Sequence, residues 1–248
     1  MSKKIQILNP NPFVYNTVNY VLEGGEEIDV PVKFHGSAGS NSASLIVSGL
    51  PSFNLEENLQ YLIKYPYGCL EQISSSAFVQ LMLDQLSELN ETQKLESDNN
   101  IRAAIRKIPN YQLASGGMAL WPGTSGASLW AGSYAGHFML LAEQKGYVIP
   151  GLVKDKWLKF QKARVNSYSS RSDYQGDSDL QQAYRLYTLA LANQADLSAM
   201  NRLKENSSLN QAAAWRLAAA YAISGKDEVA LQLINNESEE TDFDKSKS

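Results

Sequence analysis

The sequence predicts a mainly α-helical protein, in which hairpins of helices form a solenoid or a closed α/α toroid, preceded by a short β segment. From residue 54 onward, apolar residues recur at helical spacing in segments that short loops connect. Residues 1–50 instead place β-branched and aromatic residues between Gly, Asn and Pro. No strict repeat period is visible, which disfavours arrays of the TPR type.

The β segment, residues 1–50, is expected to contain four short strands. Turn residues separate them, at Glu23–Glu26 and in the Gly- and Ser-rich stretch Gly36–Ser42. So few strands leave unpaired edges unless further strands complete a sheet. The expected strands are Ile5–Leu8, Phe13–Leu22, Ile28–Phe34 and Ser44–Ser48.

Two helices are expected next. Asn54 is a candidate N-cap and Glu57 stands three residues later, which is the spacing of a capping box. Pro66 ends this helix. The second helix starts near Cys69 and is apolar nearly all round through Leu86, so that it belongs in an interior.

The remaining helices complete a domain that spans residues 51–236. The helix at 208–224 has the highest intrinsic propensity because it is rich in Ala, and Gly225 is a natural stop. The polar residues 237–248 are expected to form a frayed tail. The other helices are expected at residues 92–108, 127–145, 151–165, 178–194, 196–205 and 226–235.

The stretch Tyr65–Gln72, with the sequence Tyr-Pro-Tyr-Gly-Cys-Leu-Glu-Gln, contains the only cysteine of the chain. Cys69 and Gln72 are three residues apart at a helix start, so their side chains lie on one face. A thiol and a carboxamide held together can lose ammonia and close into an internal thioester, which stores an acyl group. A lone cysteine is otherwise most often a small buried hydrophobic residue.

The same stretch resembles the thioester signature of the bacterial alpha-2-macroglobulins, a family related to complement components. Leu70 stands where the vertebrate members carry Gly, and it matches the bacterial branch. The resemblance extends over about residues 1–240, through the segments Leu50–Leu55, Tyr61–Leu62 and Gly116–Trp121.

The resemblance implies an incomplete α/α toroid, because the family's toroid has about six helical hairpins and this chain has fewer. It implies that residues 1–50 belong to a CUB-like β-sandwich. The implied function is that of a thioester domain in a protease inhibitor, with target proteases and the remaining domains of the parent protein as partners. It also implies export to the periplasm or cell envelope, although no signal peptide is recognisable at the start of this sequence.

The implied chemistry is covalent trapping. Cys69 attacks the Gln72 carboxamide, and a lysine amine of the protease later attacks the Gln72 carbonyl and releases the thiolate. This is single-use acyl transfer, so no enzyme activity is expected. Because a stored thioester must be kept from water, Tyr65, Tyr67 and Trp121 are candidate shielding residues, although each fits an ordinary core position equally well.

The histidines bear on the target chemistry. Family members that prefer hydroxyl targets use a downstream histidine to take over the acyl group, and the corresponding region, Gln161–Gln182, has none. Direct aminolysis is therefore expected. His35 and His137 are also the only candidates for a base that would make Cys69 a protease-type nucleophile. His35 falls in a strand region and His137 in an apolar helix, where a core role is expected.

Composition excludes several classes of function. The net charge is −4 and the 22 Lys and Arg residues are scattered, so nucleic-acid binding is disfavoured. One cysteine cannot form an internal disulfide, and the chain offers no Cys and His pairs for zinc. No apolar run approaches the length of a membrane span. We expect no cofactor and no metal.

Two alternatives from other classes remain open. An α/α toroid enzyme, such as a glycosidase, lyase or cyclase, needs paired carboxylates or an aspartate cluster aimed at a cavity. Asp177 and Asp179 are paired only in a loop, and Asp84 and Asp98 are isolated. The third class is a non-covalent helical interaction scaffold.

Overall fold

The computed structural model describes residues 14, 16–35, 39–45, 47, 61–86, 88–169, 178–206 and 209–238, with side chains up to residue 235. Contacts along the chain divide it into two units, Met1–Phe53 and Asn54–Ser248. Each unit is described by itself below.

In the first unit, the described residues are irregular apart from turns and carry no strand. A turn at residues 23–26 is closed by the Glu26 N–H, which donates to Glu23 O over 3.1 Å. The prediction of strands is therefore wrong for the described residues of three ranges, Phe13–Leu22, Ile28–Phe34 and Ser44–Ser48. The fourth expected strand, Ile5–Leu8, lies outside the described residues. The physical reason is that apolar side chains here stay exposed, and an extended pair without a packed face is marginal at best. The β-sandwich stays a prediction.

The regular structure in the described part of the second unit is helical apart from isolated β-bridges, which confirms the predicted mainly α fold class. The observed bounds lie within a few residues of the expected ones, apart from the short 3₁₀ helix η1, which was not expected. Of the helix expected after Asn54, only residues 61 and 62 are described as helical, and Asn54 and Glu57 lie outside the described residues. The elements are α2 Leu70–Leu86, α3 Glu91–Lys107, η1 Ile108–Tyr111, α4 Leu129–Gln144, α5 Gly151–Ser167, α6 Asp179–Leu191, α7 Leu197–Lys204, α8 Gln211–Ile223 and α9 Asp227–Ser238.

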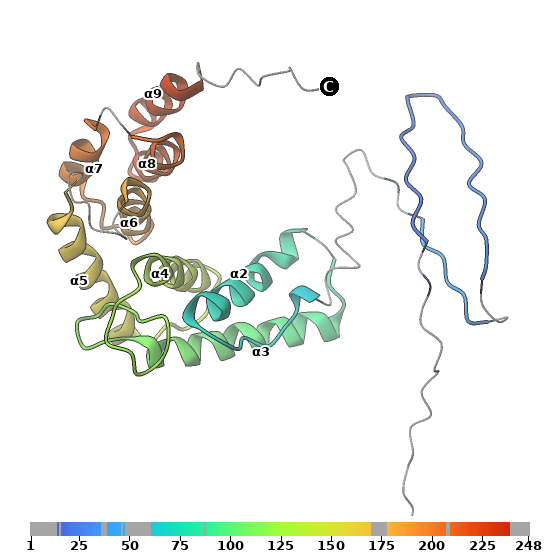
Figure 1. The fold of residues 1–248 in the computed structure, drawn as a ribbon, viewed down its shortest axis with the longest axis horizontal. Coiled ribbons are helices and arrows are strands. Elements are labelled where there is room, and N and C mark those ends of the chain that lie inside the picture. The colour runs from blue at the N-terminus through green and yellow to red at the C-terminus, as the bar shows by residue number, and fades with distance from the viewer. Residues whose placement is uncertain are drawn as a thin grey trace, which may run out of the picture. The chain divides into compact units, whose positions relative to one another are not determined.

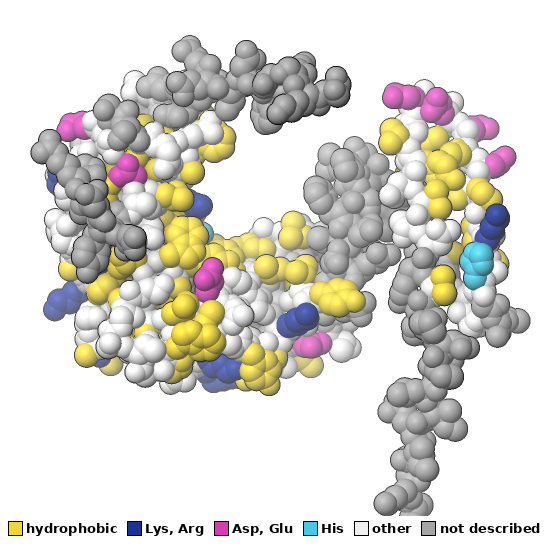
Figure 2. Space-filling model, viewed as in Figure 1, with side chains coloured by type: hydrophobic (Ala, Val, Ile, Leu, Met, Phe, Trp, Pro, Cys, Tyr) yellow, Lys and Arg dark blue, Asp and Glu magenta, His cyan; other side chains and the backbone are white. Residues whose placement is uncertain are grey.

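The helices of this unit form successive hairpins. α2 contacts α4, α4 contacts α6 and α6 contacts α8, while each also packs on the helix that follows it in sequence. Figure 1 shows α2, α4, α6 and α8 along the inner side of an arc, with α3, α5 and α7 on its outer side. This is the layered arrangement of an α/α toroid, formed here as an arc of hairpins. Figure 2 shows apolar side chains along the concave side of the same arc.

Polar residues at the N-caps fix where several helices begin. In each case a side-chain oxygen accepts the backbone N–H three residues later, which satisfies one of the free N–H groups of the first turn. No helix in the described part of the chain combines the length and apolar character that crossing a bilayer requires. The capping residues are Asn90, Ser128, Ser178, Asp196 and Asn210.

α5 packs closely on α4 because Gly136 of α4 leaves room for a tryptophan. Trp157 is fully buried, and its Nε1 donates to Gly132 O over 2.9 Å. A Cβ on Gly136 would stand only 1.9 Å from the Trp157 ring. This contact fixes the distance between the two helices and therefore the position of the loop that precedes α4.

Candidate thioester site

The candidate site lies at the first turn of α2. Cys69 immediately precedes the helix and Gln72 is its third residue. The Cys69 N–H donates to Oε1 of Gln72 over 3.0 Å. This is one half of a capping box, in which the third residue of the helix accepts from the N-cap backbone. Asn90 and Gln93 make the same 3.0 Å bond at the start of α3.

Gly68 allows the Gln72 side chain to fold back against the chain. Its φ is +104°, in the left-handed region that favours glycine. A Cβ at this position would stand 2.0 Å from Gln72 Oε1 and 2.9 Å from Gln72 Cδ. The carboxamide therefore occupies the space that any other residue at 68 would need, directly beside Cys69.

Three hydrogen bonds hold the backbone around the two residues. Nζ of Lys107 donates to Pro66 O over 2.7 Å, and the Tyr111 hydroxyl donates to Gly68 O over 2.6 Å. The Leu70 N–H donates to Leu120 O over 2.9 Å. Sequence reasoning missed Lys107 and Tyr111, because no pattern links residues about 40 positions apart.

Leu70 and Tyr111 anchor this region in the core. Leu70 is fully buried, so this position beside Cys69 belongs to the core. Tyr111 is 6% exposed. Burial raises the pKa of the Tyr111 phenol, and the neighbouring Cys69 raises it further. The phenol is therefore a hydrogen-bond donor at neutral pH.

The three candidate shielding residues lie at the surface of the second unit. Tyr65, Tyr67 and Trp121 are 46%, 74% and 50% exposed. The Tyr65 and Tyr67 rings lie 4.6 Å apart, and Nζ of Lys107 lies 4.2 Å and 4.6 Å from their centroids. Trp121 follows Leu120, which binds the first turn of α2. Their shielding role stays a prediction.

Cys69 is a free cysteine in this structure and is only partly buried. It is therefore less buried than a typical structural cysteine of a protein core. His137 does not serve as the base that a protease-type cysteine would need. Its Nδ1 lies 3.0 Å from the Tyr184 hydroxyl, and its ring contacts Phe78 and Tyr187.

His137 is a core residue of α4, as expected, but its hydrogen bonding is incomplete. It is 8% exposed, and within the described residues its Nε2 meets no hydrogen-bond partner. Burial, together with the guanidinium of Arg216, lowers the pKa of His137 to about 4. The imidazole is therefore neutral at physiological pH.

Of the aspartates considered for an α/α toroid enzyme, those that the structure describes each contact different side chains and not one another. Asp84 binds Lys145 over 2.8 Å, and Asp98 binds Arg102 over 2.8 Å. Asp179 accepts from Tyr168 and from Asn206, and Asp177 lies outside the described residues. No group of three or more His, Cys, Asp or Glu side chains among the described residues could hold a metal ion.

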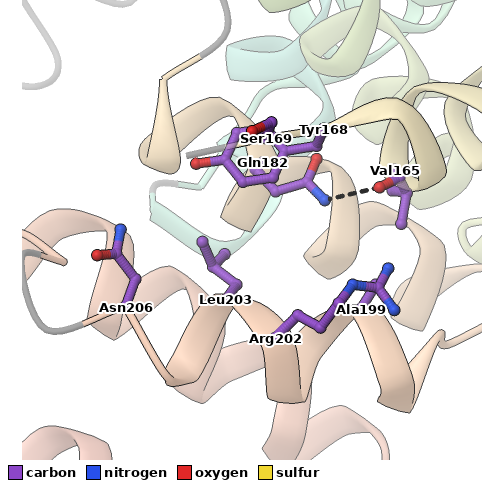
Figure 3. A pocket seen from close by; sticks show the side chains of 8 residues that line it. All are labelled: Val165, Tyr168, Ser169, Gln182, Ala199, Arg202, Leu203 and Asn206. Carbon is purple, nitrogen blue, oxygen red and sulfur yellow. Dashed lines mark hydrogen bonds between the residues drawn. The ribbon is translucent and has the colours of Figure 1, made fainter. Parts of the chain in front are cut away.

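A cavity of about 350 Å³ lies elsewhere, between the end of α5, α6 and α7. Its lining includes Tyr168, Gln182 and Arg202, and none of the residues around Cys69. Figure 3 shows Gln182 donating to Val165 O across one wall.

Comparison with known protein families identifies the family of this chain. Residues 42–183, more than half of the chain, match the A-macroglobulin TED domain. The chain belongs to this family. The TED domain match includes the Cys69 loop and the helices α2 to α5.

Individual alpha-2-macroglobulins agree with this assignment. The chain is 29% identical over 209 residues to the alpha-2-macroglobulin of Escherichia coli (strain K12), covering 78% of this chain and 12% of that protein. A solved structure of the native E. coli protein matches with a TM-score of 0.65 at 22% identity, over 77% of this chain and 13% of that one. A Salmonella alpha-2-macroglobulin reacted with methylamine matches with a TM-score of 0.65 at 25% identity and the same coverage. The chain thus spans about an eighth of the length of these relatives.

Proposed function

We propose that this TED domain forms a thioester between Sγ of Cys69 and Cδ of Gln72, and that it serves a bacterial protease inhibitor as its covalent trap. The observation that carries the proposal is the hydrogen bond of 3.0 Å from the Cys69 N–H to Gln72 Oε1. It holds the carboxamide next to the residue that bears the proposed nucleophile, and keeping two reacting groups close favours their reaction.

The chemistry is acyl storage followed by transfer. The Cys69 thiol adds to the carboxamide carbon, and ammonia leaves with the thiol proton. A lysine amine of a protease then attacks the acyl carbon, and the thiolate of Cys69 is the leaving group. Each chain reacts once, because the thioester is not regenerated after transfer, so the domain does not act as an enzyme.

The expected target is an amine. The only histidines of the chain are His35 and His137. His137 is paired with Tyr184 in the core, and neither lies in the sequence region where hydroxyl-transferring relatives carry theirs. Direct aminolysis by lysine side chains needs no such relay. Tyr65, Tyr67 and Trp121 are proposed to limit access of water, together with the remaining domains of a longer parent protein in the periplasm or cell envelope.

Methylamine and two paired variants test the proposal. The unmodified chain is expected to incorporate one methylamine at Gln72 and to release one thiol. Cys69→Ala and Gln72→Glu are expected to do neither. Gln93→Glu is the matched control, because Gln93 makes the same capping bond at the start of α3 without a cysteine partner. Incorporation by Cys69→Ala equal to that of the unmodified chain would contradict the proposal.

A further inference from the structure

The loop before Cys69 is bound to its surroundings through alternate carbonyls. Lys64 O accepts from Ser76 Oγ over 3.0 Å and from Gln80 Nε2 over 2.9 Å. The next alternate carbonyls, of Pro66 and Gly68, accept from Lys107 and Tyr111. Through the carbonyls of three successive alternate residues, the loop is therefore hydrogen-bonded to side chains of α2, α3 and η1.

Lys107 and Tyr111, which donate the last two of these bonds, lie close together in sequence, where η1 follows α3. Lys107 is the final residue of α3 and Tyr111 the final residue of η1. Nζ of Lys107 also lies within 5 Å of the centroids of both Tyr65 and Tyr67, where a cation is attracted to the ring faces. The ammonium group thus joins a backbone carbonyl and two side chains of the loop.

Tyr111 ties the loop to a second segment as well. Its hydroxyl binds Gly68 O, while its own carbonyl accepts the Ala119 N–H over 2.8 Å. The neighbouring Leu120 O accepts from Leu70 N. Because Gly68 must hold a positive φ for the Gln72 carboxamide to fold back, a fixed Gly68 carbonyl limits the loop to the conformation in which Cys69 and Gln72 meet.

We propose that Lys107 and Tyr111 are positioning residues for thioester formation, acting as a two-point clamp on the carbonyls of Pro66 and Gly68. This rests on the proposed function. In the step that they assist, the bond between Cys69 Sγ and Gln72 Cδ forms and the bond between Cδ and the amide nitrogen breaks. The nitrogen leaves as ammonia with the thiol proton, and neither clamp residue gains or loses an atom.

The test compares the fraction of chains that have lost ammonia, measured by intact mass, together with the rate of methylamine incorporation. Tyr111→Phe removes only the hydroxyl, and Lys107→Met removes the ammonium group. We expect each to lower the fraction of thioester relative to free thiol by roughly threefold to tenfold, the effect of one lost hydrogen bond. Lys107→Arg, which can still donate to Pro66 O, is expected to restore most of it.

Two controls separate positioning from general stability. Tyr221→Phe removes a buried hydroxyl that donates to Asn201 over 2.7 Å, and Lys145→Met removes the ion pair with Asp84. Both are expected to lower the melting temperature about as much as the clamp variants do, and to leave ammonia loss unchanged.

The outcomes distinguish the two proposals. If the unmodified chain loses ammonia and Tyr111→Phe and Lys107→Met equal it in extent and rate, the clamp is wrong and the proposed function stands. If Lys107→Arg is as impaired as Lys107→Met, the role given to the ammonium group is wrong. If the unmodified chain neither loses ammonia nor releases a thiol with methylamine, the proposed function fails and the clamp fails with it.

Discussion

The backbone N–H of Cys69 donates to Oε1 of Gln72 over 3.0 Å, so the two residues proposed to form the thioester are joined by one half of a capping box. At the start of α3 the same box is complete, because Asn90 Oδ1 also accepts the Gln93 N–H over 2.9 Å. The cap side chain of such a box points toward the third residue. With cysteine as the cap, a complete box would set a thiol beside a carboxamide.

Gly68→Ala is expected to prevent most thioester formation. The new Cβ would meet Gln72 Oε1 at 2.0 Å, and the positive φ of +104° adds strain of about 1–2 kcal/mol. Intact mass of the purified variant measures the fraction that has lost ammonia. Gly225→Ala is the matched control, because its φ of +71° is also positive and nothing lies within 4 Å of its Cβ. Ammonia loss by Gly68→Ala at the level of that control would contradict the geometry.

Gly136→Ala is expected to destabilise the second unit by about 1–3 kcal/mol, as overpacking of a core does. Its Cβ would overlap the ring of Trp157. Urea unfolding measures the change. Gly132→Ala, one turn earlier on α4, places its Cβ at an ordinary 3.6 Å from Met118 and is expected to be neutral or to stabilise by up to about 1 kcal/mol. Equal midpoints for the two variants would show that Trp157 does not fix the α4–α5 contact.

Stability is expected to fall in acid because of His137. Its pKa is lowered from 6.5 to about 4, so the unfolded chain takes up the proton first. The contribution of the neutral imidazole is complete above pH 6.5 and is lost as the pH falls toward about 4. The loss amounts to about 2–3 kcal/mol between about pH 7 and about pH 4.5.

Urea unfolding at the two pH values, for the chain and for His137→Gln, measures this effect. The variant is expected to lose less stability on acidification by that amount, because its side chain does not titrate. His35→Gln, at an exposed position of the first unit, is the control and should behave as the unmodified chain does. The same acid dependence in His137→Gln would rule out this explanation.

The helices and the pair Cys69 and Gln72 could be predicted from the sequence because both depend on short spacings. Apolar periodicity located α2 to α9, and a separation of three residues predicted that Cys69 and the Gln72 carboxamide are neighbours. Lys107 and Tyr111 could not be found this way, since their partners Pro66 and Gly68 lie 41 and 43 positions earlier. Their roles depend on how α3 packs along the loop.

In the β segment, the sequence predicted strands that the described residues do not form. Val18, Val30 and Val32 have strand propensity, yet each is more than 40% exposed and the described residues around them form no ladder. Propensity alone does not make a strand, because the pairing energy comes from cross-strand neighbours and a covered face.

The central claim is that a bond joins Cys69 and Gln72, and the mass of the freshly purified chain tests it most directly. We expect the mass to be lower than that of the sequence by one ammonia. Treatment with methylamine should then add one methylamine to the peptide that contains Gln72 and produce a free thiol at Cys69. A chain of full sequence mass, whose thiol reacts at once and whose Gln72 takes up no methylamine, would contradict it.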